Sequence, residues 1–455
     1  MLRGVKAAID GDAATDKLIA AANLGGQVSY VLADMTTGKV LAARLPHLPM
    51  PPASTAKVIT SLYALAHLGA DHRFETRLLA NGPVSAGQLQ GDLMLVGGGD
   101  PTLTTDTLGD FTSDIARLGV KSVAGRFQVW AGALPYIAEI DRDQPDWVGY
   151  NPAVAGLNLN FNRVNFTWQR GSDGYELGFD ARAERFAPAV FMAKMQVVDR
   201  EAPLFTYEQH GATENWTVAK AALGTAGSRW LPVRRPDIYA GDVFQSLSRA
   251  TGLDLSKPEI LDGLPQARLL ARHDSENLWI ILREMMKYST NMTAEAVGMA
   301  ASLRLGIADH AASAQQMTSW LSGKIGRSDA RFVDHSGLGG RSRISAADMV
   351  EAVIQLGADA GLSGLMKEVK LKTDVTSVAG KGRVLAKTGT LNFVSALVGY
   401  LTTATGEERA FAIFSGDPDR RDAVPEAQKE SPQGLSGWLK RSRRLQQQLL
   451  GSWAA

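Results

Sequence analysis

Several features that often define a protein's chemistry are missing from this sequence. It contains no cysteine, which excludes disulfide bonds and is compatible with an oxidising cell envelope as well as with the cytosol. Its seven histidines show no His-Glu-x-x-His or similar zinc spacing. No Gly-x-Ser-x-Gly occurs, so the nucleophile turn of the α/β-hydrolases is absent as well. The sequence therefore disfavours both a zinc hydrolase and an α/β-hydrolase.

Charge of one sign and long apolar runs are also scarce. The net charge is +1 and no basic block is long enough for a nucleic-acid footprint, so we expect no nucleic-acid partner. There is no run of 18 apolar residues, and Met1–Lys6 lacks the apolar core of a signal peptide. With 45% hydrophobic and 21% charged residues, the 455-residue chain is expected to form two or three globular domains.

A Ser-x-x-Lys motif is the most informative feature that is present. Ser54 and Lys57 are one helical turn apart at the start of an apolar helical stretch, so the lysine amine can reach the serine hydroxyl. The preceding Pro51-Pro52-Ala53 stops any helix from running in from upstream. An N-cap serine is the alternative, because a Ser-x-x-Lys occurs by chance about once in a chain of this length. The motif predicts a serine nucleophile with a lysine base.

A Lys-Thr-Gly lies far downstream of this motif. Lys387, Thr388 and Gly389 sit on a predicted strand that a turn connects to a second apolar strand over 394–401. An edge strand can hold an extended peptide by main-chain pairing, and glycine lets the peptide backbone come close. We therefore expect Lys387 and Thr388 to meet a substrate carboxylate.

Two segments compete for the third motif, Ser-x-Asn. Ser275-Glu276-Asn277 precedes an amphipathic helix, where Asp274 and Ser275 are interpreted as helix caps. Ser289-Thr290-Asn291 follows that helix and forms a short polar corner before a second helical stretch. We favour Ser289 and Asn291 as site residues.

The ordered set of motifs resembles the class C low-molecular-mass penicillin-binding proteins, over about residues 28–445. The motifs that carry this resemblance are Pro51–Lys57, Gly97–Pro101, Ser289–Asn291, Asp334–Leu338 and Lys387–Thr390. Thr290 departs from the Asp or Asn that is frequent between the serine and the asparagine. The resemblance implies a D-alanyl-D-alanine carboxypeptidase or endopeptidase of peptidoglycan stem peptides, inhibited covalently by β-lactams. It also implies a periplasmic or cell-envelope location, which assumes a leader that has been cut off or left out of the numbering.

Spacing and patterning then suggest an architecture. About 230 residues separate Lys57 from Ser289, far more than a compact β-lactamase-like helical domain needs. The resemblance places a large insertion at 71–274, mainly β and forming one or two accessory domains. Residues 1–70 and 275–455 would form the penicillin-binding domain. Its expected fold is α+β, with an antiparallel sheet of strands from both ends of the chain covered by helices over 54–70 and 275–355.

Three further segments have structural interpretations. Gly97–Asp100 is predicted to be a tight turn and Leu157–Asn162 a half-buried strand. The lone His335 is interpreted as structural. The basic amphipathic helix over 435–450 is compatible with an anionic membrane surface, but a helix packed on the sheet with its charges in water is favoured. Integral membrane association is not expected.

The resemblance also implies a mechanism. Ser54 would attack the penultimate D-alanine carbonyl with Lys57 as base, Ser289 would relay a proton, and Asn291 would hold the substrate amide. Lys387, Thr388 and Thr390 would bind the terminal carboxylate, while the Ser54 and Thr390 N–H groups form the oxyanion hole. No metal or organic cofactor is needed. A serine β-lactamase and a non-catalytic peptidoglycan-binding protein of the same fold are the alternatives.

Overall fold

The chain forms two compact units in a computed structural model that describes residues 2, 13–372 and 382–454. The first unit comprises residues 1–70, 278–294 and 304–455, and the second comprises residues 71–277 and 295–303. The accessory-domain assignment of 71–274 stays a prediction. Of the segment Met1–Lys6, only Leu2 is among the described residues. In the described ranges, no helix has the length and apolar character needed to cross a membrane.

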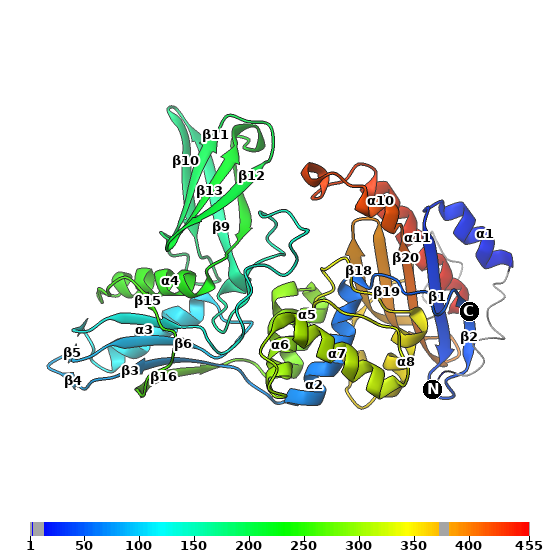
Figure 1. The fold of residues 1–455 in the computed structure, drawn as a ribbon, viewed down its shortest axis with the longest axis horizontal. Coiled ribbons are helices and arrows are strands. Elements are labelled where there is room, and N and C mark those ends of the chain that lie inside the picture. The colour runs from blue at the N-terminus through cyan, green and yellow to red at the C-terminus, as the bar shows by residue number, and fades with distance from the viewer. Residues whose placement is uncertain (1, 3–12, 373–381, 455) are drawn as a thin grey trace. The chain divides into compact units, whose positions relative to one another are not determined.

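A six-stranded antiparallel sheet forms the centre of the first unit (Figure 1), in the order β17-β18-β19-β20-β1-β2. The α+β fold predicted from the sequence is confirmed, with strands from both chain ends in one sheet. The structure adds the two-residue strand β17 to the five predicted strands. The strands are β1 (Gln27–Asp34), β2 (Val40–Arg44), β17 (Lys367–Glu368), β18 (Arg383–Leu391), β19 (Val394–Thr402) and β20 (Glu408–Gly416).

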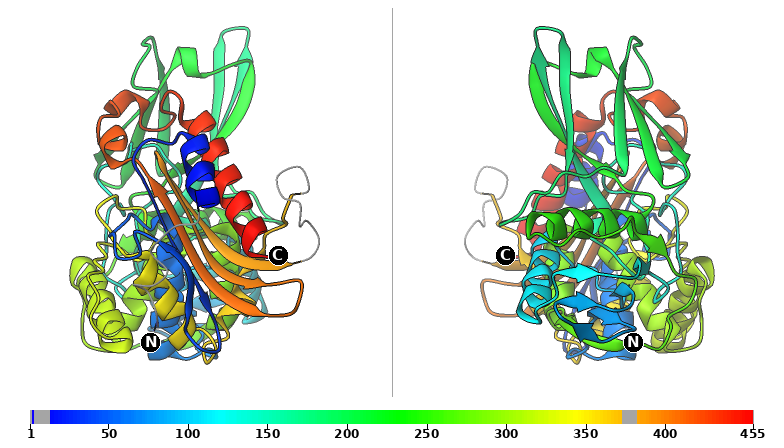
Figure 2. Two further views of the ribbon diagram at one scale, coloured as in Figure 1. Left: turned by 90° about the vertical axis from the view of Figure 1, so that its right-hand side faces the viewer. Right: turned by 90° about the vertical axis from the view of Figure 1, so that its left-hand side faces the viewer.

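Helices cover both faces of this sheet, which explains why its central strands are apolar on both faces. On one face α8 contacts β1 and β20, and η2 contacts β18 and β19. On the other face α11 contacts β19 and α1, as Figure 2 shows. Trp438 anchors α11, since its indole is fully buried and donates a hydrogen bond of 2.6 Å to the carbonyl of Leu24. The predicted C-terminal helix is therefore confirmed.

Helices α2, α5 and α7 pack on one another, since α2 contacts α5 and α7, and α7 contacts α8. Helix α6 (Asn291–Leu303) begins in the first unit, and its residues 295–303 belong to the second. The other helices of the first unit are α1 (Ala13–Ala22), η2 (Ala53–Thr55), α2 (Ala56–Leu68), α5 (Leu278–Tyr288), α7 (His310–Ile325), α8 (Ala346–Leu356), α9 (Leu362–Leu365), α10 (Pro418–Asp422), η5 (Glu426–Gln428) and α11 (Leu435–Trp453).

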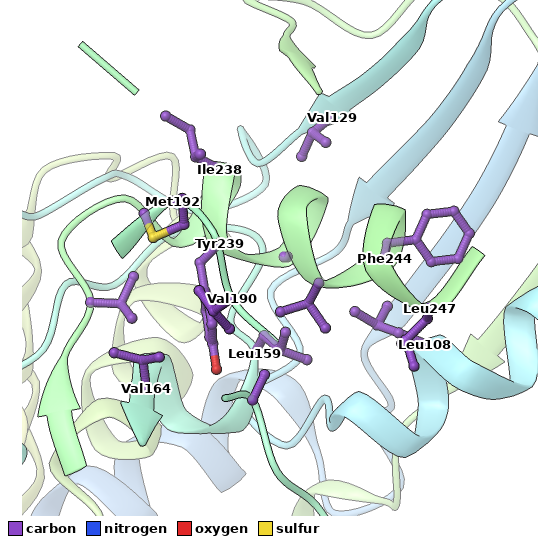
Figure 3. Packing of buried hydrophobic residues seen from close by; sticks show 14 of the residues in the cluster. Leu108, Val129, Leu159, Val164, Val190, Met192, Ile238, Tyr239, Phe244 and Leu247 are labelled. Carbon is purple, nitrogen blue, oxygen red and sulfur yellow. The ribbon is translucent and has the colours of Figure 1, made fainter. Parts of the chain in front are cut away.

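The second unit is mainly β and has its own hydrophobic core, in which α4 packs through Tyr239, Phe244 and Leu247 (Figure 3). Its sheets have the orders β15-β8-β6-β3-β16, β10-β9-β14, β11-β13-β12 and β4-β5-β7. The principal elements are β3 (Glu75–Ala80), β6 (Leu93–Gly97), α3 (Thr105–Arg117), β8 (Phe127–Trp130), β9 (Arg163–Gly171), β10 (Gly174–Asp180), β11 (Ala193–Val198), β12 (Phe205–His210), β13 (Thr213–Ala219), β14 (Ala226–Pro232), α4 (Pro236–Ala250) and β16 (Arg268–Asp274). The short elements are β4 (Val84–Ser85), β5 (Gln88–Leu89), β7 (Ser122–Val123), η3 (Asn160–Asn162), η4 (Lys220–Ala222) and β15 (Glu259–Ile260).

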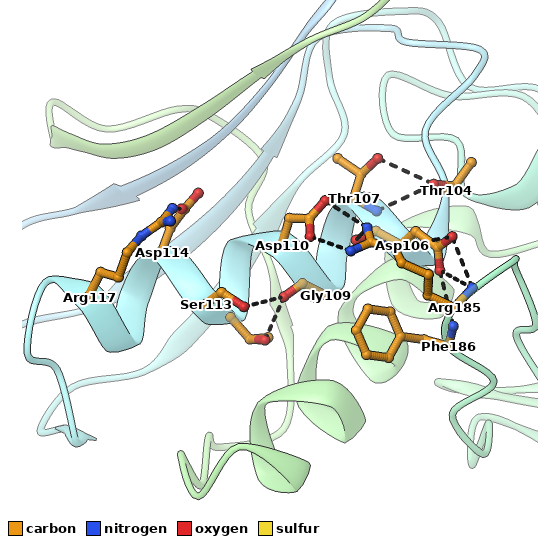
Figure 4. A network of polar contacts seen from close by, with 11 residues as sticks. Thr104, Asp106, Thr107, Gly109, Asp110, Ser113, Asp114, Arg117, Arg185 and Phe186 are labelled. Carbon is orange, nitrogen blue, oxygen red and sulfur yellow. Dashed lines mark hydrogen bonds and ion pairs between the residues drawn. The ribbon is translucent and has the colours of Figure 1, made fainter.

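Polar contacts at helix α3 attach a neighbouring loop (Figure 4). The Arg185 guanidinium donates to both carboxylate oxygens of Asp110 at 2.9 and 2.8 Å, and the Arg185 N–H contacts Asp106. The Thr104 hydroxyl caps the helix by accepting from the N–H of Thr107. Arg185 and Asp110 are exposed to water, so their ion pair adds little to stability and mainly orients the loop.

The strand predicted over Leu157–Asn162 is wrong. Asn160, Phe161 and Asn162 have φ values of 49°, 58° and 50°, in the left-handed region that asparagine tolerates better than most residues. The buried asparagine amides bond to nearby backbone, for example Asn158 with both the N–H and the carbonyl of Ala155. Alternation of apolar and polar residues here reflects a buried asparagine turn.

The helix caps predicted at Asp274 and Ser275 are also wrong. Asp274 is the last residue of strand β16, and α5 begins only at Leu278. The Ser275 side chain is 1% exposed, and its hydroxyl accepts from the N–H of Phe74 at 2.9 Å. Ser275 therefore joins two backbone segments within the second unit, because strand pairing with β3 extends further along the chain than the helix pattern indicated.

A buried carboxyl group makes the stability of the second unit dependent on pH. Glu214 is fully buried, and its Oε1 accepts from the N–H groups of Arg234 and Arg235 at 2.8 Å each. Burial outweighs these bonds and raises the pKa of Glu214 to about 7. Between its ordinary value of 4.5 and 7, the folded state binds more protons than the unfolded state.

We predict that the free energy of unfolding falls by about 3 kcal/mol as pH rises from 4.5 to 7 and the buried carboxyl group loses its proton. Glu214→Gln keeps an acceptor but cannot titrate, so its stability should change less over the same range. Urea unfolding of both proteins at several pH values measures this difference. An unchanged pH slope in the variant would contradict the assignment.

Candidate active site

Ser54 stands at the entrance to helix α2, within the short helix η2. It is partly exposed, whereas its neighbours Ala53 and Thr55 are buried. Ala53 has a φ of 48°, a conformation that costs a non-glycine residue of the order of 1–3 kcal/mol. Gly337 packs directly against it, since a Cβ there would lie 1.8 Å from the Ala53 carbonyl oxygen. The surrounding packing thus holds a strained turn that presents the Ser54 hydroxyl.

Lys57 connects this hydroxyl to two other parts of the chain. Its side chain is completely buried. The Lys57 Nζ donates to Ser54 Oγ at 3.0 Å, to Asn291 Oδ1 at 2.8 Å and to the Ser336 carbonyl at 2.8 Å. Because a buried amine needs hydrogen-bond partners, these contacts determine where the amine lies. They hold it within hydrogen-bond reach of the predicted nucleophile.

The corner between α5 and α6 supplies Ser289 and Asn291. Ser289 has a φ of 61°, so it turns the chain sharply between the two helices, and Asn291 begins α6. The Ser289 hydroxyl accepts from Lys387 Nζ at 2.9 Å. The structure thus brings both predicted residues of this motif to the site, whereas Ser275 lies in the other unit.

Strand β18 forms the opposite wall of the site. Lys387 is 2% exposed, and its Nζ also donates to the Thr388 carbonyl at 2.8 Å. Burial, and then the nearby charge of Lys57, lower the pKa of Lys387 to about 6. At Gly389 an added Cβ would lie 2.7 Å from the Pro52 carbonyl and 3.1 Å from the Ser54 N atom. Only glycine permits the strand to approach Ser54 this closely.

Thr388 and Thr390 share the other side of this strand. Side chains alternate along a strand, and both threonines are exposed whereas Lys387 and Gly389 are buried. Strand β17 pairs only with Leu385 and Ala386, so β18 has no described strand partner on that side from Lys387 to Leu391. Within the described residues, this part of β18 is a free edge on which an extended peptide can pair.

The Asp334–Leu338 motif contributes a group that sequence reasoning missed. The Asp334 carboxylate accepts from the N–H groups of Gly337 and Gly339 at 2.8 and 2.5 Å, and so closes a tight turn. This turn presents the Ser336 carbonyl to Lys57. The motif was visible in the sequence, but a backbone carbonyl leaves no side-chain signal.

His335 lies in the same turn but faces away from the nucleophile. Its ring is fully buried and contacts Ser313 Oγ at 2.7 Å and Met317 Sδ at 3.4 Å. These contacts agree with the structural interpretation of this histidine. Within the described parts of the chain, no group of three or more acidic or histidine side chains is arranged to hold a metal ion.

A serine held by a lysine, beside a second serine–lysine pair at the free edge of an antiparallel sheet, defines a serine acyl-transfer enzyme of the penicillin-binding type. The D-Ala-D-Ala carboxypeptidase 3 (S13) family model matches residues 12–441. The chain therefore belongs to this family and is a serine-type D-Ala-D-Ala carboxypeptidase. The predicted resemblance to class C low-molecular-mass penicillin-binding proteins is confirmed.

Individual proteins show the same similarity. The chain is 26% identical over 413 residues to D-alanyl-D-alanine carboxypeptidase DacB of Haemophilus influenzae, which covers 86% of this chain and 85% of DacB. It is 29% identical over 443 residues to a D-alanyl-D-alanine carboxypeptidase of Actinomadura sp. strain R39, covering 86% and 78% of the two chains. The crystal structure of Haemophilus influenzae penicillin binding protein 4 (dacB) in complex with a β-lactam has a TM-score of 0.72 at 22% identity, covering 96% of this chain and 99% of that one. This structure has the same fold.

Proposed function

We propose that the protein cleaves the terminal peptide bond of peptidoglycan stem peptides through an ester on Ser54. The observation that carries this proposal is the 3.0 Å contact between Lys57 Nζ and Ser54 Oγ. In its neutral form Lys57 would take the Ser54 proton as the oxygen attacks the penultimate D-alanine carbonyl. Asn291 and the Ser336 carbonyl would keep the amine in place during this transfer.

The leaving amine would receive its proton through Ser289. The Ser289 hydroxyl lies at the end of α5, 2.9 Å from Lys387 Nζ. A hydroxyl in this position can pass its proton to the leaving nitrogen and be reprotonated from a lysine. Water would then hydrolyse the Ser54 ester and release the shortened peptide.

The free edge of β18 would bind the substrate. Gly389 permits close approach to the substrate backbone, while Thr388, Thr390 and protonated Lys387 would bind the terminal carboxylate. The N–H groups of Ser54 and Thr390 would form the oxyanion hole, in which one donor contributes roughly 3–4 kcal/mol. No step in this scheme uses a metal or an organic cofactor.

The same chemistry extends to related substrates. If the leaving amine belongs to a neighbouring stem peptide, the reaction is endopeptidase cleavage of a cross-link. A β-lactam would acylate Ser54 in the same way, as the β-lactam complex of the Haemophilus protein suggests. Peptidoglycan as substrate places the protein in the periplasm or elsewhere in the cell envelope.

We predict that benzylpenicillin forms a covalent adduct with the wild-type protein and none with Ser54→Ala. The physical reason is that the Ser54 hydroxyl lies 3.0 Å from the buried Lys57 amine, which can take up its proton. Intact-protein mass spectrometry measures the adduct. A penicillin-sized mass increase that persists in Ser54→Ala would refute the assignment, and rapid penicillin turnover without peptidase activity would favour a β-lactamase.

The two Ser-x-Asn segments provide a matched pair of variants. Ser289→Ala should slow acylation by penicillin by about 10²–10³-fold, because it removes the proton relay. Ser275→Ala should leave the acylation rate unchanged and lower stability by about 1–3 kcal/mol, because the Phe74 N–H loses its acceptor. Stopped-flow acylation and urea unfolding measure the two effects, and equal acylation rates in both variants would contradict the assignment.

Binding of anions should depend on the protonation of Lys387. With a pKa of about 6, Lys387 is charged below pH 6 and largely neutral above it. In the Ser54→Ala background, benzylpenicillin should therefore bind about tenfold more weakly at pH 8 than at pH 5, because a charge-assisted contact is lost. Equilibrium binding measurements across this pH range test the prediction. In Ser54→Ala/Lys387→Met the affinity for benzylpenicillin should not depend on pH in this way.

A further inference from the structure

A second cavity lies behind the free edge of β18, on the sheet face that α11 covers. We call it the outer cavity. Its volume is about 670 Å³, and strand β18, strand β19, helix α11 and the segment 367–372 line it. This volume falls within the range of about 300–1,000 Å³ that is typical of small-molecule sites. Its lining includes Thr388, Gly389 and Thr390 of the predicted substrate-binding strand. It does not include Ser54, Lys57, Ser289, Asn291 or Lys387.

Cations surround the outer cavity. Lys440, Arg443 and Arg444 lie on α11, and Lys367 and Lys372 lie on the segment 367–372, which contacts α11 through the Lys372 N–H and Gln447. Among the described residues, none of those that line the cavity is an aspartate or a glutamate. Several like charges around a concave surface attract anions more strongly than any single exposed charge does.

The floor of the outer cavity is a buried polar pair. Gln446 is 6% exposed and Ser395 is 2% exposed, and Gln446 Nε2 donates to Ser395 Oγ at 3.1 Å. Both residues line the cavity. Buried polar groups at its base, below a cationic rim, suit a polar anion better than an apolar ligand.

The outer cavity is continuous with the proposed carboxylate site. Thr388 pairs across the sheet with Leu397, which packs in the core formed with α11, and Thr390 pairs with Ser395. Both threonine side chains therefore lie on the α11 face, and both line the outer cavity. The two threonines therefore belong both to the proposed carboxylate site and to the lining of the cavity.

We propose that the outer cavity binds a second carboxylate carried by the leaving segment of the substrate. This inference rests on the proposed function, because the leaving residue's own carboxylate must first reach Thr388 and Thr390. When the Ser54 ester forms, the peptide C–N bond breaks, and the leaving nitrogen takes up a proton and departs with this segment. Because Lys440, Arg443 and Arg444 carry positive charge on its lining, the cavity favours leaving segments that carry a carboxylate beyond the terminal one.

The position of the cavity favours a peptide over a membrane lipid as the source of the anion. The threonines shared with the carboxylate site connect the cavity to substrate binding. The apolar residues of α11, including Trp438, Leu445 and Leu449, are buried in the protein core and leave no apolar face to enter a bilayer.

Two isosteric substrates test the proposal. We would compare kcat/KM for Nα-acylated D-Ala-D-Glu and D-Ala-D-Gln, whose leaving residues differ in one charge. Wild type should prefer the D-Glu substrate by about tenfold, and this preference should fall as salt increases. In Arg443→Ala/Arg444→Ala the preference should fall to about twofold or less, and Arg443→Glu should reverse it.

Controls separate this proposal from the proposed function. Lys370→Ala removes an exposed cation of the same segment that does not line the cavity, and it should keep the wild-type preference. Hydrolysis of D-Ala-D-Ala and acylation by penicillin should be unchanged in the arginine variants.

Failure of each hypothesis has its own signature. Equal cleavage of the D-Glu and D-Gln substrates by an enzyme that penicillin acylates would overturn only the outer-cavity proposal. The same holds if the arginine variants lose binding to phosphatidylglycerol vesicles but keep the substrate preference. A wild-type protein that neither cleaves peptides nor reacts with penicillin would overturn both proposals.

Discussion

The site depends on the burial of one amine. Lys57 has no exposed surface, and its Nζ donates to Ser54 one helical turn away and to Asn291 and Ser336, which are 234 and 279 residues away along the chain. An unsatisfied buried amine is costly, so folding that buries Lys57 must also bring these acceptors together. The same contacts leave the amine beside the hydroxyl that it is proposed to deprotonate. The hydrogen bonds of the buried Lys57 amine thus both stabilise the core and position the nucleophile.

Close backbone packing maintains this arrangement. Ala53 and Ser289 both have left-handed φ values, and both adjoin or belong to the proposed catalytic groups. Gly337 and Gly389 pack against the turn at Ala53 so closely that neither position has room for a side chain. Strain of this kind persists only where the surroundings determine the conformation. Holding Ser54 at the edge of β18 therefore costs the protein some of its folding stability.

The positive charges on the two faces of β18 differ in burial and in how they depend on pH. Lys387 is buried and has a lowered pKa, so its charge depends on pH and on a bound anion. The cations of the outer cavity lie largely in water on α11 and on the segment 367–372. Thr388 and Thr390 lie between these two sets of charges along one strand edge. A substrate with two carboxylates would engage both, the first at a titrating lysine and the second at fixed positive charges.

The sequence by itself determined the motifs, the family and most of the strands of the central sheet, because each rests on local spacing or on short-range alternation. Sequence already favoured Ser289 over Ser275, although each precedes an asparagine at the same spacing. Only the tertiary structure shows that the two serines belong to different units and that Ser289 lies 2.9 Å from Lys387 Nζ. It also revealed the Ser336 carbonyl and the asparagine turn at 158–162, where backbone groups and left-handed φ values leave no periodic signal. The outer cavity could not be predicted either, because it joins α11 to β18 across a long stretch of chain. Contacts of this kind follow from packing, which local sequence does not encode.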